Sequence, residues 1–187
     1  SCPDKTKLVY ISTDQVYGKT GDHSETYTNL QPVNQYGKTK LLGEQKVQEH
    51  CPDHIIIRTN IFGWNVKPGK ISSAEWIYNS LTNGQEITLF TDYIFSPIYT
   101  ECLGGIIMHL VDEDFTGIIN AGASTPCSKY DFGMQLAEEF GLNLLKIRNG
   151  SINDHSFFAP RFYKLDLDVK KLSGLDISPP DYRVSIR

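Results

Sequence analysis

Two short apolar runs flank a helical stretch near the start of the chain, and this order restricts the fold more than any other feature. Lys7–Ile11 (KLVYI) and His54–Thr59 (HIIIRT) are as short and continuously apolar as strands covered on both faces. Residues 35–50 between them have the pattern of a helix, with Asn34 as N-cap and Pro52 beyond its end. Strand, helix and strand form a right-handed crossover, which predicts a parallel α/β sheet.

Polar side chains follow both predicted strands. Ser12, Thr13 and Asp14 end the first run, and Asn60 follows the second. Ligands of open α/β sheets bind beyond the carboxyl ends of the strands, so these groups are well placed for chemistry. Taken alone, the Ser-Thr-Asp stretch favours a loop whose side chains only satisfy backbone amides.

Tyr36 and Lys40 are four residues apart at the start of the predicted helix, so they share one helix face. A phenol beside an ammonium, with a hydroxyl and a carboxylate supplied by a strand end, can act on a carbonyl group. The alternative for an isolated pair of this kind is a surface tyrosine with a solvated lysine.

The pattern changes after residue 65 to shorter elements. Helices are predicted over 73–81, 99–111, 129–140 and 167–172, and strands over 86–90, 117–121 and 142–147. Segments 91–97 and 152–164 are predicted to be irregular.

Composition excludes several functions. The net charge is -4 and Lys and Arg form no run, so nothing points to nucleic acid. No apolar run approaches the roughly 20 residues that span a bilayer, and Ser1–Lys5 has no apolar core of a signal peptide. The histidines are not spaced as metal ligands, and we expect no metal.

The four cysteines are scattered without paired spacing, which argues against a zinc site or a disulfide scaffold. We expect free, mostly buried thiols in a reducing cytoplasm, and therefore a cytoplasmic protein; the cysteines are Cys2, Cys51, Cys102 and Cys127.

A dinucleotide-binding fold has a glycine-rich turn between its first strand and first helix. Gly18–Gly21 (GKTG) has the wrong spacing and no helix after it, and Gly104 and Gly105 lie inside a helical pattern. These 187 residues therefore contain no recognisable cradle for a pyrophosphate.

Several of these stretches together resemble the extended short-chain dehydrogenase/reductases, and within them most closely the dTDP-4-dehydrorhamnose reductases. They are 12–18 (STDQVYG), 25–26 (ET), 32–44 (PVNQYGKTKLLGE) and 58–63 (RTNIFG). The resemblance implies the C-terminal portion of a Rossmann-like parallel sheet with a smaller mixed α/β substrate-binding part. Residues 1–65 are then the second half of the Rossmann-like domain, and 66–187 form the substrate-binding part, returning strand 117–121 to the sheet.

The resemblance also implies roles for individual residues. Tyr36 is expected to be the general acid, and Lys40 to lower the pKa of Tyr36 and to hold the nicotinamide ribose. Thr13 is expected to donate to the substrate carbonyl oxygen, and Asp14 to orient the sugar or take part in proton transfer. Asn60 and the backbone near Phe62 are expected to face the nicotinamide and the substrate.

For the nucleotide-sugar substrate, the candidate for the diphosphate is Arg161, since a guanidinium forks onto phosphate oxygens. Asp14 and Asn60 are the other expected substrate contacts. Trp64, Phe95 and Tyr99 are candidates for the wall of the base pocket, with ordinary packing as the alternative for all of them.

The implied function is the NADPH- or NADH-dependent reduction of a 4-keto nucleotide sugar, with this chain as the catalytic and substrate half of a longer protein. The expected partners are a nucleotide sugar and either a second copy or the missing N-terminal half; the half alone is expected to be inactive. A nucleotide-sugar epimerase and a non-catalytic subunit, like the regulatory subunit of methionine adenosyltransferase in the same family, remain alternatives. Related 4,6-dehydratases have a glutamate where this chain has Gln15, which disfavours dehydration.

Overall fold

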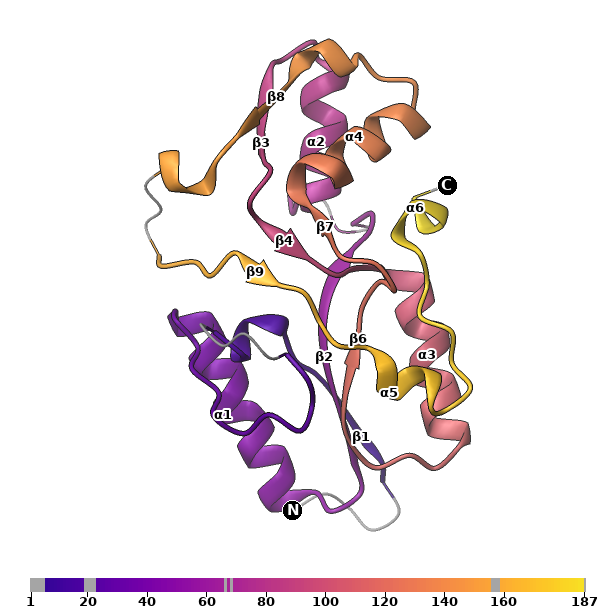
Figure 1. Ribbon diagram of the computed structural model, residues 1–187. Helices are drawn as coiled ribbons and strands as arrows, with labels where there is room; N and C mark the ends of the chain where they lie inside the picture. Colours follow the sequence, from indigo (N-terminus) through magenta and orange to yellow (C-terminus); the bar gives the residue numbers. More distant parts are fainter. Residues whose placement is uncertain (1–5, 19–22, 66, 68, 156–158, 187) are drawn as a thin grey trace.

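The computed structural model describes residues 6–18, 23–65, 67, 69–155 and 159–186. A four-stranded parallel sheet lies in the lower half of Figure 1, and its central strand is β2 (His54–Phe62). The strands that pair with β2 are β1 (Leu8–Ile11), β5 (Pro97–Tyr99) and β6 (Gly117–Ala121). All three pairings are parallel, which confirms the predicted α/β class.

The isoleucine run of β2 is buried on both faces of this sheet. Ile56 packs against α1 (Gln35–His50), whereas Ile55 and Ile57 face the opposite side and pack with α3 (Thr100–Asp112). Each of the three isoleucines is fully buried. A strand between two layers of helices has no solvent face, which explains the continuous apolar run instead of an alternating one.

A buried ion pair fastens α1 to β2. The guanidinium of Arg58 donates to the carboxylate of Glu44 through Nη2 at 2.7 Å and through Nε at 3.1 Å. Ser12, at the end of β1, donates its hydroxyl to the same carboxylate. Arg58 and Glu44 are both almost fully buried, so the pair joins the helix and two strand ends inside the protein.

A second, smaller unit lies in the upper half of Figure 1, where two helices cover a two-stranded parallel sheet. Its helices are α2 (Ser73–Thr82) and α4 (Lys129–Glu139), and its strands are β3 (Ile87–Phe90) and β8 (Ile147–Gly150). Both helices begin with capping boxes, at Ser72 and at Ser128.

A third sheet of two-residue strands connects these units: β4 (Ile94–Phe95) pairs with β7 (Cys127–Ser128) and β9 (Lys164–Leu165). The remaining elements are α5 (Lys170–Ser173), α6 (Tyr182–Ser185) and the 3-10 turns η1 (Asp14–Val16), η2 (Leu144–Lys146) and η3 (Ile152–Asp154). The predicted boundary at residue 65 stays a prediction, and β5 and β6 from beyond it join the first sheet.

The strand expected over 142–147 is wrong. The side chain of Asn143 accepts from the amide of Leu145 and caps η2, and the strand that follows is β8. Leu145 is 88% exposed, so its apolar side chain marks no buried strand face. The expected helix over 167–172 begins only at Lys170, and α6 was not predicted.

The cysteines differ in part from expectation. Cys102 and Cys127 are free thiols, whereas Cys51 is disulfide-bonded, so the expectation of a free thiol at Cys51 is wrong. Cys2 lies outside the described residues. Among the helices of the described segments, none is both long and apolar enough to cross a membrane.

Candidate active site

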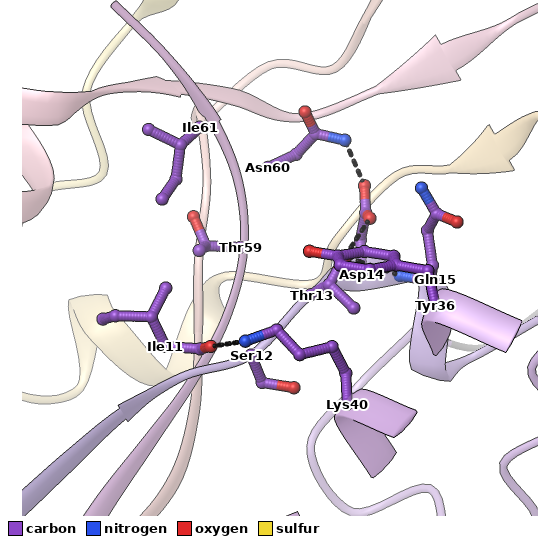
Figure 2. Close-up of a pocket in the computed structure, with 10 residues that line it drawn as sticks. All are labelled: Ile11, Ser12, Thr13, Asp14, Gln15, Tyr36, Lys40, Thr59, Asn60 and Ile61. Carbon is purple, nitrogen blue, oxygen red and sulfur yellow. Dashed lines mark hydrogen bonds between the residues drawn. The ribbon is translucent and has the colours of Figure 1, made fainter. Parts of the chain in front are cut away.

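The ends of β1 and β2 open into one cavity of about 320 Å³, drawn in Figure 2. After β1 the chain turns into η1, with Thr13 as its N-cap, and both Thr13 and Asp14 are buried. β2 contributes the next wall, and α1 the third. The lining residues are Ile11, Ser12, Thr13, Asp14, Gln15, Tyr36, Lys40, Thr59, Asn60 and Ile61.

Tyr36 and Lys40 meet at this cavity from successive turns of α1, as Figure 2 shows. The ammonium of Lys40 donates to the carbonyl oxygen of Ile11 at 2.6 Å and lies 4.7 Å from the ring centroid of Tyr10. Lys40 is therefore held at the strand end, while Tyr36 is 53% exposed and accessible to a ligand.

Asp14 supplies a buried carboxylate to the cavity. Its Oδ2 accepts from Asn60 Nδ2 at 2.6 Å, and its Oδ1 accepts from Thr13 Oγ1 at 3.1 Å (Figure 2). Burial raises the pKa of Asp14 to about 6, although both hydrogen bonds and the charge of Lys129 oppose that shift. A carboxyl with this pKa can change its protonation state just below neutral pH.

Thr59 is a site residue that the sequence did not single out. Its side chain is buried and lines the cavity, and within the described part of the chain Oγ1 has no hydrogen-bond partner. A buried hydroxyl without a partner carries a free-energy cost, so its position at the cavity suits a ligand that supplies the partner. The local sequence pattern could not have revealed that the Thr59 hydroxyl lines a cavity, since it predicts only that Thr59 is the last residue of a buried strand.

A second cavity of about 410 Å³ adjoins the first, because Gln15 and Asn60 line both. Arg161, the residue that the sequence offered for the diphosphate, lines this second cavity. The other lining residues come from α2, β3, the position just before β4 and the start of α4; they are Ser73, Trp76, Ile77, Thr88, Leu89, Phe90, Tyr93 and Lys129.

Lys129 is the second residue that the sequence analysis missed. Its ammonium lies 3.4 Å from the ring centroid of Phe95 and 5.4 Å from that of Tyr93, and burial lowers the pKa of Lys129 to about 8. A signal was present: Lys129 is the first residue of α4, where the positive end of the helix dipole disfavours a cation.

The aromatic candidates for the base pocket are placed elsewhere. Trp64 packs edge-on against Tyr78 and Phe140, with ring centroids 5.6 and 5.4 Å away, and Phe95 is a core residue that is 2% exposed. Trp64 and Tyr99 line a separate small cavity near α6. Trp64, Phe95 and Tyr99 therefore line neither of the two adjoining cavities, whereas Trp76 and Tyr93 line the second one.

The side chain of Phe62 is also in the core, 6% exposed, with its ring centroid 5.1 Å from that of Phe132. Phe157 and Phe158 lie outside the described residues. No group of three or more His, Cys, Asp or Glu side chains in the described ranges is arranged to hold a metal ion.

Comparison with known proteins gives a family match over residues 3–187, to the RmlD substrate binding domain. The chain is 32% identical over 185 residues to a dTDP-4-dehydrorhamnose reductase of Mycolicibacterium smegmatis, covering 96% of this chain and 56% of the relative. It is 28% identical to methionine adenosyltransferase 2 subunit beta of Danio rerio, covering 96% and 58%.

Among solved structures, the chain resembles a dTDP-4-dehydrorhamnose reductase of Bacillus anthracis in complex with NADP. The TM-score is 0.86 at 24% identity, over 96% of this chain and 63% of that one. At this identity the likeness establishes the fold alone. The chain thus spans less than two thirds of the length of each protein compared here.

Proposed function

The chain belongs to the RmlD substrate binding domain family, and we propose that it is the catalytic and substrate-binding part of an enzyme that reduces a 4-keto nucleotide sugar with NADPH or NADH. The observation that carries this proposal is the meeting of four side chains at one cavity: Thr13, Asp14, Tyr36 and Lys40. They come from a strand end and a helix start, and the cavity continues into a second, cationic one.

The first cavity fits the nicotinamide end of such a cofactor. Thr59 holds a buried hydroxyl without a partner among the described residues, and Lys40 is held at the same cavity. A bound nicotinamide supplies the hydride for the sugar C4 carbon. The contribution of this chain is to orient both reactants, since oriented reactants lose much less entropy on the way to the transition state.

Tyr36 donates the proton that the C4 oxygen needs when it becomes a hydroxyl. A phenol ordinarily has a pKa of about 10, so it needs a nearby cation to release its proton near neutral pH. Lys40 shares the helix face with Tyr36 and is held in place by the carbonyl of Ile11, so its positive charge is placed to stabilise the phenol oxygen as the proton leaves.

Thr13 donates a second hydrogen bond to the C4 oxygen. While Asp14 is ionised, the Thr13 hydroxyl donates to it. When Asp14 is protonated, it can itself donate to Thr13 Oγ1, and the Thr13 proton is then available for the substrate. Asp14 and its partner Asn60 also orient the sugar between the two cavities.

Arg161 and Lys129 bind the diphosphate in the second cavity. Two cations at one cavity suit a group with two negative charges, and a guanidinium can bind phosphate oxygens with two parallel hydrogen bonds. Trp76, which is 45% exposed at the same cavity, offers a face for the nucleotide base.

There are two alternative functions. An epimerase acting on a nucleotide sugar would use the same first cavity, and it would form an isomer of the sugar without net consumption of the cofactor. A non-catalytic subunit is favoured by the similarity to methionine adenosyltransferase 2 subunit beta. Gln15 has no titratable group and cannot act as the base of a dehydratase.

The deciding experiment is Tyr36→Phe in the full-length protein, assayed with dTDP-4-dehydrorhamnose and NADPH. The variant should lose about 10²- to 10⁴-fold in kcat, since it removes a general acid. Tyr78→Phe, in the aromatic cluster with Trp64, is the matched control and should keep its activity. Wild-type turnover that survives Tyr36→Phe within about threefold would contradict the proposed chemistry.

A further inference from the structure

One side chain connects three segments around the two cavities. Asn34 Oδ1 accepts from the amide of Gly37 at 2.9 Å, which caps α1. Asn34 Nδ2 donates to Gln15 Oε1 at 2.8 Å and to the carbonyl oxygen of Pro160 at 3.1 Å. Both N–H groups of the amide are therefore engaged, one with each segment.

Each partner of Asn34 lies next to a residue of the proposed chemistry. Gly37 follows Tyr36 on α1, and Pro160 precedes Arg161. Gln15 lines both cavities. In Figure 1 the segment that leads into β9 passes above the first turn of α1, in agreement with the hydrogen bond to Pro160.

The first turn of α1 packs closely against η1 at Gly37. A Cβ atom placed on Gly37 would lie 2.8 Å from the carbonyl oxygen of Gln15 and 2.9 Å from Cβ of Pro32. Real Cβ contacts of that length are essentially never seen. The first turn of α1 therefore lies directly on the Gln15 backbone, and a shift of either segment moves the other.

We propose that Asn34 is a positioning residue that couples phosphate binding at Arg161 to the alignment of Tyr36. The proposal rests on the proposed function, because it takes Arg161 as the phosphate contact and Tyr36 as the acid. When a phosphate binds, Arg161 moves toward it and the neighbouring Pro160 shifts as well. Asn34 follows Pro160 through their hydrogen bond, and this holds the first turn of α1 against η1.

Capping alone does not require asparagine at this position. Aspartate and serine cap helices about as well, but neither side chain can donate from an N–H group. Asn34→Asp therefore keeps the cap and removes the donors to Gln15 and Pro160. Asn143 also caps a turn with its side-chain oxygen and lines neither cavity, so Asn143→Asp is the matched control.

The test is hydrogen exchange with mass spectrometry, with thymidine diphosphate as the probe. In the wild type, the probe should slow exchange in the peptide 33–41 as well as in the segment 159–164. In Asn34→Asp the probe should still bind within about threefold of the wild-type affinity, but protection of 33–41 should be lost. Asn143→Asp should behave as the wild type in both binding and protection.

Steady-state kinetics distinguish a positioning role of Asn34 from a role in stability alone. Asn34→Asp in the full-length protein should lower kcat about tenfold with little change in the KM of the nucleotide sugar, because misplacement of an acid costs rate rather than binding. Gln15→Ala combined with Asn34→Asp should be no worse than the poorer single variant, since both break the same connection.

The outcomes distinguish the two proposals. Thymidine diphosphate that binds and protects 159–164 but leaves 33–41 unchanged overturns the coupling and leaves the proposed function standing. A wild type that does not bind the probe overturns both. Additive losses in the double variant would also count against a shared role of Gln15 and Asn34.

Discussion

The two cavities of this protein adjoin but are built in different ways. The first is lined by three segments, 11–15, 36–40 and 59–61, which belong to one strand–helix–strand unit. The second collects residues from separate stretches of the chain, at positions as far apart as 15 and 161. The first therefore depends on local structure and the second on how distant segments pack, and this difference can be tested residue by residue.

The largest expected effect comes from breaking the buried ion pair between Arg58 and Glu44, which lies next to the first cavity. Arg58→Met leaves the Glu44 carboxylate buried without its cation, so the free energy of unfolding should fall by about 3–5 kcal/mol. Urea unfolding measures it. Adding Glu44→Gln should recover a large part of the loss. A single variant as stable as the wild type would show that the ion pair does not hold the first cavity together.

Asp14→Asn should raise the free energy of unfolding at neutral pH, the opposite of the effect expected for Arg58→Met. Burial raises the pKa of Asp14 to about 6, above the ordinary value of about 3.9, so the folded protein holds a proton that the unfolded chain has lost between these pH values. Stability from this group is complete below the ordinary value and is lost as pH rises through about 6, by about 3 kcal/mol in all.

Unfolding at about pH 4 and about pH 7, on either side of the titration, measures this difference. Because asparagine does not titrate, Asp14→Asn should be more stable than the wild type at neutral pH and should lose this part of the pH dependence. Asp154→Asn, at an exposed position of η3, is the control. An unchanged pH dependence in Asp14→Asn would show that burial of the ionised Asp14 carboxylate does not lower the stability of the protein.

Lys129 tests the second cavity. Because burial lowers the pKa of Lys129 to about 8, its charge should be lost as pH rises through that value, whereas a guanidinium in its place would keep its charge. Affinity for thymidine diphosphate should fall about tenfold when Lys129→Met removes the cation. Between about pH 7 and pH 9 affinity should also fall in the wild type.

Calorimetric titration at both pH values separates the contributions. Lys129→Met should show a flatter pH dependence, and Lys129→Arg should bind with little pH dependence. Lys46→Met, at a surface ion pair on α1, should behave as the wild type. Equal pH dependence in the wild type and in Lys129→Met would remove Lys129 from the phosphate site.

The smallest expected effect concerns Thr59. Thr59→Val keeps the shape of the side chain and removes a buried hydroxyl that has no partner in the described segments, so stability should rise by about 1 kcal/mol. Thermal unfolding measures the gain. If the hydroxyl serves a ligand of the first cavity, the same variant should weaken cofactor use, seen as a higher KM for NADPH in the full-length protein. A loss of stability would mean that Thr59 has a partner inside the fold.

The sequence by itself determined the first cavity. The apolar runs of β1 and β2, the Asn34 cap and the four-residue spacing of Tyr36 and Lys40 all act over short distances along the chain. Parallel strands in one crossover unit open at the same sheet edge, so Thr13 and Asn60 had to come together once the unit formed.

Only the tertiary structure decided the second cavity and the connection between the two. Lys129, Trp76 and Tyr93 have no pattern in common, and the two-residue strands β4, β7 and β9 exist only because distant segments pair. Trp64 and Phe95 look as suitable for a ligand as Trp76 does, but packing places Phe95 in the core and Trp64 against Tyr78, away from the second cavity. Burial and pairing between distant segments arise from the packing of the whole chain, which is the physical reason that residue type and spacing could not reveal them.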